Sequence, residues 1–280
     1  MNSYFKQINM PGVFTITQWN TLADSLSDSF PKCDQQYLKW DYRSQNIKNH
    51  LLNEAYADII CLEEVDHPNF FSSFLDQTHQ LVFHKKPEGE DGQLVAISKQ
   101  KFQILKQEAI QYKSGDGKKD MNQSFWSVIV LDKQTNKQFL LLVTHLKAKK
   151  QFEDIRVLQV EQILEHIQKI QKENNKDIPI VFAGDFNAEP TYSCIQKIKQ
   201  QGILNSAYEE KGLTFTTYKV REPNDVQIRM IDYIFFTHDS LELLSIKNLP
   251  TQDQIGPNGL PNQTFSGDHL SLTATFKFMK

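Results

Sequence analysis

The stretch PIVFAGDFNAEP, from Pro179 to Pro190, joins an apolar run to a short polar turn. Its apolar part is rich in β-branched and aromatic residues and is bounded by Pro and Gly, which predicts a buried strand over residues 178–183. Asp185 and Asn187 follow directly, so the end of this strand would bring a carboxylate and an amide to one place. Gly, Asp and Asn also tolerate left-handed backbone, so the same letters equally fit an ordinary turn.

Seven further runs have the composition of strands. They are Val13 to Trp19, Asp58 to Leu62, Gln93 to Ser98, Phe125 to Leu131, Gln138 to Thr144, Arg229 to Thr237 and Leu270 to Phe278. Helical spacing of apolar residues predicts helices at Tyr37 to Ala55, Phe152 to Ile170, and Pro190 to Gln201, the last with its Pro in the first turn. Many strands and few helices favour two packed sheets with helices outside, a mixed α/β fold.

Polar side chains stand where several of these apolar runs begin or end. They belong to Asn20, Glu63, Glu64, His145, Asp268 and His269. Segments far apart in the sequence would thus bring carboxylates, amides and imidazoles to comparable places on strands, as expected if they share one site. Each also has a plainer interpretation, because Asn20 could cap backbone groups and Asp268 with His269 could be a polar pair on the surface.

Asp232 is different, because it lies inside the apolar stretch MIDYIFF. A buried carboxylate is costly unless a cation, a histidine or several donors pair with it. His269 is a candidate partner, since an Asp–His pair fixes the tautomer of the imidazole and raises its basicity.

Bringing Glu64, Asp185, Asp232 and Asp268 into one cleft would require a cation, because their charges repel. Carboxylate and amide oxygens suit Mg²⁺, which keeps several waters and binds substrate phosphates. Zinc is disfavoured because no HxxxH, HExxH or CxxC spacing is present. The P-loop and GxGxxG patterns of nucleotide-binding proteins are also missing from the sequence.

The composition of the sequence limits the classes of protein to which the chain can belong. The 280 residues carry 31 Lys and Arg against 34 Asp and Glu, a net charge of -3, which argues against coating nucleic acid by bulk charge. No repeat or linker marks a boundary, so we expect one domain over residues 1–280. No signal peptide or membrane span is evident, and three widely spaced cysteines suit reduced thiols. We expect a cytoplasmic protein with no membrane partner, leaving mitochondrial association open.

Eight segments in order resemble the motifs of the endonuclease/exonuclease/phosphatase superfamily, and within it the nocturnin and deadenylase branch. They are QWNTLADSL (18–26), KWDYR (39–43), DIICLEEVD (58–66), THLKA (144–148), AGDFNAEP (183–190), TFTTYKVR (214–221), IDYIFF (231–236) and SGDHLSL (266–272). The resemblance covers almost the whole chain. It implies a four-layer α/β/β/α sandwich of two mixed sheets, with a Mg²⁺-dependent phosphoesterase site at one end, where Mn²⁺ could replace Mg²⁺.

The resemblance also implies roles for individual residues. The metal ligands would be Glu64, Asn20, Asp185 and Asp268. The catalytic residues would be His145, Asp185, Asn187, Asp232 and His269. In this scheme Asp185 and Asn187 position the attacking water, Asp232 orients His269, and the two histidines bind the scissile phosphate.

Three positions depart from the family pattern. Glu63 stands where relatives usually have Gln, and Gly267 replaces the usual Ser. Lys149 occupies a place where nocturnin-like proteins carry Arg. Because Lys lacks the bidentate fork of Arg, recognition of a 2'-phosphate could be altered.

Five residues beside the site motifs are candidates for substrate binding: Lys147, Lys149, Tyr218, Lys219 and Arg221. The lysines and Arg221 could form a local basic patch, although most exposed lysines only solubilise a surface. Tyr218 could stack on a base, or it could be an ordinary half-exposed strand residue.

Three functions follow. The first is a 3'-5' exoribonuclease acting on poly(A) or other single-stranded RNA. The second is a phosphatase that removes the 2'-phosphate of NADP(H), a phosphorylated dinucleotide. The third is a scaffold subunit that keeps the fold without turnover, which the complete set of site residues disfavours. The sequence leaves protein partners open.

Overall fold

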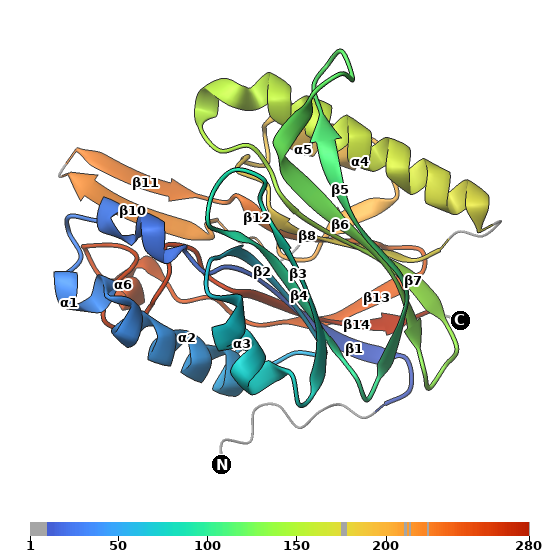
Figure 1. Cartoon of the computed structure of the whole chain (residues 1–280), viewed down its shortest axis with the longest axis horizontal. Coiled ribbons are helices and arrows are strands. Elements are labelled where there is room, and N and C mark those ends of the chain that lie inside the picture. Colours follow the sequence, from blue (N-terminus) through green and yellow to red (C-terminus); the bar gives the residue numbers. More distant parts are fainter. Residues whose placement is uncertain (1–9, 175–177, 210–211, 213, 223, 280) are drawn as a thin grey trace.

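Two six-stranded sheets lie face to face in the part of the chain that the computed structural model describes, residues 10–174, 178–209, 212, 214–222 and 224–279 (Figure 1). The first sheet has the order β13 (Leu241–Ile246), β14 (Leu272–Phe278), β1 (Val13–Asn20), β2 (Ile59–Val65), β4 (Gly92–Ser98), β3 (His79–Lys85). The second has the order β5 (Phe102–Lys113), β6 (Asp120–Asp132), β7 (Gln138–His145), β8 (Ile180–Asp185), β12 (Asp232–Thr237), β9 (Leu204–Ser206).

Helices cover the outer face of each sheet (Figure 1). Over the first lie α2 (Trp40–Asn53) and α3 (Pro68–Leu75), which bury Ile47, Leu51, Phe71 and Leu75 against it. Over the second lie α4 (Glu153–Glu173) and α5 (Ser193–Lys199). The buried residues of α4 include Val160, Ile163, Ile167 and Ile170, whose spacing of three and four keeps them on one face. The predicted four-layer mixed α/β sandwich is confirmed.

Each sheet has one parallel pair near its centre, and these pairs position the site. In the first sheet β1 pairs parallel with β2, and in the second β7 pairs parallel with β8. Parallel neighbours need a crossover, which α1 (Gln35–Leu38) and α2 provide in one case and α4 in the other. The carboxyl ends of the two strands in each pair therefore lie side by side at one edge.

Gly184 allows β7 and β8 to approach closely near that edge. Its φ is 150°, and a Cβ added there would lie 2.0 Å from the carbonyl oxygen of Thr144 on β7. No other residue type fits without moving one strand. The close approach keeps His145 directly opposite Asp185 in the strand register.

Most predicted elements are confirmed, but three boundaries are wrong. The run predicted at 229–237 is broken at Met230 and Ile231, where β11 (Asp225–Arg229) ends before β12 begins. The hydroxyl of Thr216 accepts a hydrogen bond from the backbone N–H of Ile231, which replaces strand pairing there. The helix predicted at 37–55 is divided by the extended Lys39 into α1 and α2.

The helix predicted to open at Pro190 begins only at Ser193. Tyr192 N donates to the carbonyl of Glu189, so Pro190 belongs to a turn before the helix. The carbonyl of Pro190 instead accepts from the side chain of Gln196.

The sequence predictions missed α3, α6 (Gln252–Ile255), β11 except for Arg229, and several further strands, namely β3, β5, β9, β10 (Thr217–Glu222) and β13. These strands are partly exposed, and β3, β5, β9 and β13 are the outer strands of the two sheets. They therefore lack the continuous apolar run that marks a central strand. Strands β10 and β11 pair with each other as a separate hairpin that projects from the body (Figure 1).

The cysteines, the membrane-span prediction and the domain prediction can be compared with the structure. Cys33, Cys61 and Cys194 are free thiols and all are buried. Within the described residues, no helix is both long and apolar enough to cross a membrane. That the entire chain forms one domain stays a prediction.

Candidate active site

Four strand ends meet at one edge of the two sheets. Asn20 ends β1, Glu64 lies near the end of β2, His145 ends β7 and Asp185 ends β8. His145 Nε2 lies 3.9 Å from Glu64 Oε1 and 3.6 Å from Asp185 Oδ2, so the first sheet faces the second across this edge. The sequence predictions placed these residues in one cleft, and the structure brings them together.

Asn20 links the two carboxylates. Its Nδ2 donates to Glu64 Oε1 at 3.0 Å and to Asp185 Oδ2 at 3.1 Å. Its Oδ1 accepts from Leu22 N at 3.1 Å, so in this geometry the amide oxygen faces the backbone. Glu64 also accepts from Ala23 N through Oε2. The two carboxylate oxygens thus converge on one point between the sheets.

Asp185 is the most heavily contacted of these carboxylates. Its Oδ1 accepts from Asn187 N at 2.8 Å, while its Oδ2 faces His145 and, at 3.8 Å, His269 Nε2. Asn187 donates through Nδ2 to Leu146 O at 3.1 Å. Burial raises the pKa of Asp185 to about 6, against the lowering effect of His269 and Asn187.

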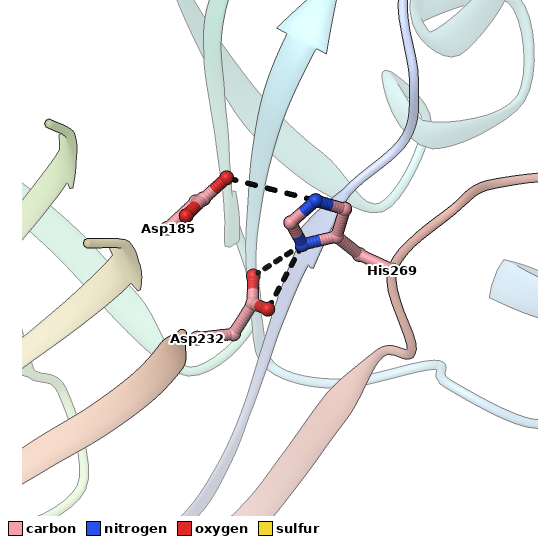
Figure 2. Close-up of side chains that lie close together, drawn as sticks. All are labelled: Asp185, Asp232 and His269. Carbon is pink, nitrogen blue, oxygen red and sulfur yellow. Dashed lines mark hydrogen bonds and ion pairs between the residues drawn. The ribbon is translucent and has the colours of Figure 1, made fainter. Parts of the chain in front are cut away.

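Asp232 and His269 form a buried pair (Figure 2). Asp232 Oδ2 lies 2.9 Å from His269 Nδ1, and Thr216 Oγ1 donates to the same oxygen at 2.5 Å. Gln18 Nε2 donates to Asp232 Oδ1 at 3.3 Å. The buried carboxylate that the sequence singled out is therefore fully partnered, and it turns His269 Nε2 toward Asp185 (Figure 2).

The two histidines have opposite electrostatic surroundings. Burial alone would lower the pKa of His269, but the carboxylates around it, led by Asp232 and Asp268, raise that pKa to about 10. Burial lowers the pKa of His145 well below its ordinary value, and Lys86 lowers it further. His269 is thus a cation and His145 a neutral imidazole, and Nδ1 of His145 is buried without a partner among the described residues.

Lys219 places an ammonium group inside the site. Its Nζ lies 2.5 Å from Asp268 Oδ2 and 3.5 Å from His269 Nε2. Although burial opposes ionisation of both groups, the charges of Lys219 and His269 lower the pKa of Asp268 to about 2. Thr217 Oγ1 donates to Asp268 O, which fixes the base of the β10–β11 hairpin to the same segment.

Glu63 and Glu64 are adjacent in sequence but face different surroundings. Glu64 has φ 55°, which breaks the alternation of β2, and its side chain is 14% exposed in the site. Glu63 is fully buried and accepts from Gln18 Nε2 at 2.9 Å. Burial and the nearby Asp232 and Asp185 raise the pKa of Glu63 well above its ordinary value. Of these two adjacent residues, Glu64 is the one placed to serve as an anionic metal ligand.

The donor set fits a divalent metal ion. We call Glu64, Asp185, Asp232 and Asp268 the acidic centre. Asp185, Asp232 and His269 offer ligand atoms within 4.8 Å of one another. His269 Nδ1 and Asp232 already bind each other, so the convergent oxygens of Glu64 and Asp185 are the better ligand pair. Asp268 Oδ1, buried and unpartnered among the described residues, adds a further acceptor. Hard oxygen donors of this kind suit Mg²⁺ or Mn²⁺.

A model of the Endonuclease/Exonuclease/phosphatase family matches residues 17–269, which include all of the acidic centre. The chain belongs to this family. Enzymes of the family are phosphoesterases that generally use a divalent metal, in agreement with the buried acidic and histidine group. The predicted family resemblance is confirmed.

Within the family, the chain is similar to nocturnin. Nocturnin of Xenopus laevis is 32% identical over 96% of this chain and 73% of its own length. Human nocturnin is 33% identical over 94% of this chain but only 65% of its own length. The CCR4-Not complex 3'-5'-exoribonuclease subunit Ccr4 of Saccharomyces cerevisiae is 24% identical over 95% of this chain and 39% of its own length.

A solved structure agrees with these sequence matches. The structure of the human nocturnin catalytic domain with bound sulfate anion superimposes on this chain with a TM-score of 0.78. The two sequences are 28% identical. The match covers 96% of this chain and 94% of that one. The nocturnin-like resemblance predicted from eight short motifs therefore extends over the full architecture.

Of the residues predicted to bind substrate, Lys219 contacts the acidic centre directly, through Asp268. We call the remaining four, Lys147, Lys149, Tyr218 and Arg221, the outer rim. Lys149 and Arg221 are exposed, and Lys147 lies over the ring of Phe152, with its Nζ 5.1 Å from the ring centroid. Tyr218 alternates with Lys219 along β10 and packs against the apolar cluster of Phe215 and Leu260. Their roles stay predictions.

Several residues that stabilise the loops around the site were not assigned a role from the sequence. Arg43 is fully buried and donates to the carbonyls of Thr21, Leu22 and Ser266, which joins the loop after β1 to the segment before His269. Arg156 is also fully buried. It donates to the carbonyls of Lys147 and Lys149, so it shapes their loop and is not available to a substrate.

Left-handed backbone is concentrated around the site. Five non-glycine residues of the described chain have positive φ: Leu22, Glu64, Asn136, Lys149 and Asn187. All but Asn136 lie in or beside the strand ends and loops that form the site. Arg43 and Asn20 hold the first of these loops, and Arg156 holds the loop of Lys149.

Proposed function

We propose that the chain is a Mg²⁺-dependent phosphoesterase and that its substrate is single-stranded RNA, which it shortens from the 3' end as a 3'-5' exoribonuclease. The observation that carries this proposal is the arrangement of Glu64 and Asp185 opposite the cationic His269, with Lys219 beside it. A phosphate between these groups would meet anionic metal ligands on one side and two cations on the other.

When bound, the metal ion would neutralise phosphate charge and polarise the ester bond. The protein groups would do the rest. Asp185 would accept a proton from the attacking water, which Asn187 helps to place. His269, held by Asp232, would donate hydrogen bonds to the phosphate oxygens as their charge develops. No nucleophilic side chain is required by this arrangement.

RNA is proposed as the substrate on two grounds. One relative is named as a 3'-5'-exoribonuclease, and it matches across nearly the whole of this chain. In addition, the outer rim places three cationic side chains beside the site, where neighbouring phosphates of a strand would lie. Such a strand would be held mainly by charge.

A second candidate is removal of the 2'-phosphate of NADP(H), which the nocturnin-like motifs imply. The observation that favours it is the small cationic surface. Lys86 and Lys85 are paired with Asp91 and Glu90, and Arg156 is buried. The cations that remain near the site suit one compact dinucleotide as well as a short strand.

One experiment separates these candidates. Pure protein with Mg²⁺ is incubated with oligo(A) RNA and, separately, with NADPH, and Glu64→Ala serves as the control. RNA shortened in single-nucleotide steps supports the exoribonuclease, and free phosphate from NADPH supports the second candidate. Turnover that persists in Glu64→Ala would contradict the proposed metal site. Absence of any phosphoester turnover would favour the scaffold alternative.

A further inference from the structure

A cavity of about 360 Å³ lies behind the segment that carries Asp268 and His269. Its walls come from the end of β1, the end of α2, the loop after β13 and the 264–271 segment. The volume falls within the range of pockets that hold small molecules. His269 lines this cavity as well as the catalytic cleft, but Glu64, Asp185, Asp232 and Asp268 do not, so the cavity lies beside the cleft and is separate from its carboxylates.

The cavity and the catalytic cleft share one wall. Trp19 lines the cavity and donates through Nε1 to His269 O at 2.9 Å. The imidazole of His269 leaves the same residue toward Asp232. The backbone of His269 is thus held from the cavity side while its side chain works on the other side.

The charged side chains of Glu54 and Lys247, which line the cavity, pair with each other. Lys247 Nζ donates to Glu54 O at 2.9 Å and to Glu54 Oε2 at 3.2 Å. His50 Nδ1 lies 3.6 Å from the same carboxylate, and its Nε2 lies 2.6 Å from Ser271 Oγ. Because Glu54 is already paired with Lys247 and His50, these side chains offer a charged ligand no unpaired opposite charge, which favours a neutral ligand.

The rest of the lining suits a flat ring with polar edges. Apolar surface comes from Trp19, Leu249, Pro250, Phe265 and Leu270. Asn248, Gln254 and Thr264 line the same cavity and are exposed. Aromatic and proline faces pack against planar rings, while amide side chains match the alternating donors and acceptors of a nucleobase edge.

We propose that this cavity is a binding site for a neutral nucleobase or nucleoside. The proposal goes beyond the phosphoesterase function and does not depend on it, because no phosphate or metal is needed for this contact. It predicts that the bound ring touches Trp19 and Phe265, and that its edge pairs with Asn248.

Adenosine is the probe, and the Glu64→Ala chain is the protein, so that turnover and metal binding play no part. Titration is followed by the indole N–H resonance of Trp19 in a ¹H–¹⁵N NMR spectrum and by calorimetry. We expect saturable binding at one site that shifts this resonance. Thr264→Trp, which fills the mouth, should remove binding, and Asn248→Ala should weaken it about tenfold. Gln80→Ala, on the exposed part of β3, is the control and should change nothing.

The proposal is overturned if adenosine at millimolar concentration leaves the Trp19 resonance unmoved, or if Thr264→Trp binds it as well as its parent does. An unchanged amide spectrum elsewhere shows that each variant is folded. If the Glu64→Ala chain binds adenosine here and the parent chain hydrolyses neither RNA nor NADPH, the phosphoesterase is contradicted and this site is not.

Discussion

The acidic centre and the outer rim lie side by side but are built in opposite ways. In and around the acidic centre, side chains from β1, β2, β7, β8, β12 and the 268–269 segment contact one another closely, as with Asp232 and His269 at 2.9 Å. In the outer rim, Lys149 and Arg221 are exposed, and the main fixed contact of Lys149 is made by its backbone carbonyl to Arg156. Side-chain contacts hold the groups of the first region in place without substrate, whereas Lys149 and Arg221 of the second are exposed to solvent.

The difference teaches where chemistry and selectivity reside. A site that must stabilise charge in the transition state benefits from groups that need no rearrangement. Recognition of the rest of the substrate tolerates mobile side chains, each contributing little by itself. We therefore expect substitutions in the acidic centre to remove turnover, and substitutions in the outer rim to change substrate preference only.

The largest expected effect separates two adjacent residues. Glu64→Gln should lower kcat by about 10³-fold or more, because it removes an anionic metal ligand. Glu63→Gln should stay within about fivefold of the parent chain, since burial and the nearby Asp232 and Asp185 raise the pKa of Glu63 and disfavour its anion, and an amide can still accept from Gln18. Steady-state kinetics of both variants test this. Equal losses in the two would mean that Glu63 also acts as an anion.

The next effect concerns the buried pair. His269→Ala should lower kcat by about 10²- to 10⁴-fold while leaving the fold intact. Asp232→Asn should follow it closely, because an amide cannot hold the same tautomer or favour the cation. The measurement is kcat at saturating substrate, with circular dichroism to verify folding. An Asp232→Asn chain with full activity would show that the pair is only structural.

Lys219 tests the boundary between the two regions. Lys219→Ala should lower kcat by about 10²-fold if its ammonium stabilises the phosphate. Lys219→Arg, which keeps the charge, should recover part of the activity. An alanine variant that changes only KM would mean that Lys219 acts in substrate binding, as the outer rim does, and not in the chemical step.

The same variant has a consequence for stability. The folded-state pKa of Asp268 is about 2, below its ordinary 3.8. The ion pair of Asp268 with Lys219 therefore contributes stability that is present above pH 3.8 and is lost as the pH falls toward 2. Denaturant unfolding at pH 7 and near pH 2 should show the alanine variant weaker than the parent only at the higher pH.

The smallest effect is expected in the outer rim. Lys149→Arg should leave kcat unchanged and lower KM for NADPH by about threefold, because a guanidinium can bind a 2'-phosphate through two hydrogen bonds. Lys277→Arg is the matched control, because Lys277 is exposed and pairs with Val13, at the end of β1 opposite Asn20. A Lys149→Arg chain with altered kcat would mean that the outer rim takes part in the chemical step.

Sequence alone predicted the elements whose signal is local. The apolar runs of β7 and β8 mark central strands, and the polar residues that follow them mark the site. Edge strands such as β5 were missed because only a few of its residues are buried. The break at Lys39 and the late start of α5 depend on turns whose hydrogen bonds reach several residues away, which composition does not reveal.

Within the site, the supporting residues were the harder part. Gln18 touches Asp232 and Glu63 from a strand more than 40 positions distant from either. A signal did exist, because Phe14, Ile16 and Gln18 share one face of β1, and the first two lie in the core between the sheets. A Gln on that inward face requires a polar partner. Thr216 and Arg43 carry no comparable pattern, and only the fold shows what they hold.

The positive φ angles at Leu22, Glu64, Lys149 and Asn187 make this end of the molecule a place where folding and catalysis compete. Each non-glycine residue with left-handed backbone lowers the free energy of unfolding by about 1 kcal/mol, compared with the same residue in a common backbone conformation. The long sheets and helices elsewhere must compensate for that cost. A sequence redesigned only for thermal stability would relax these four positions first, and it would lose the geometry that sets Glu64 against Asp185.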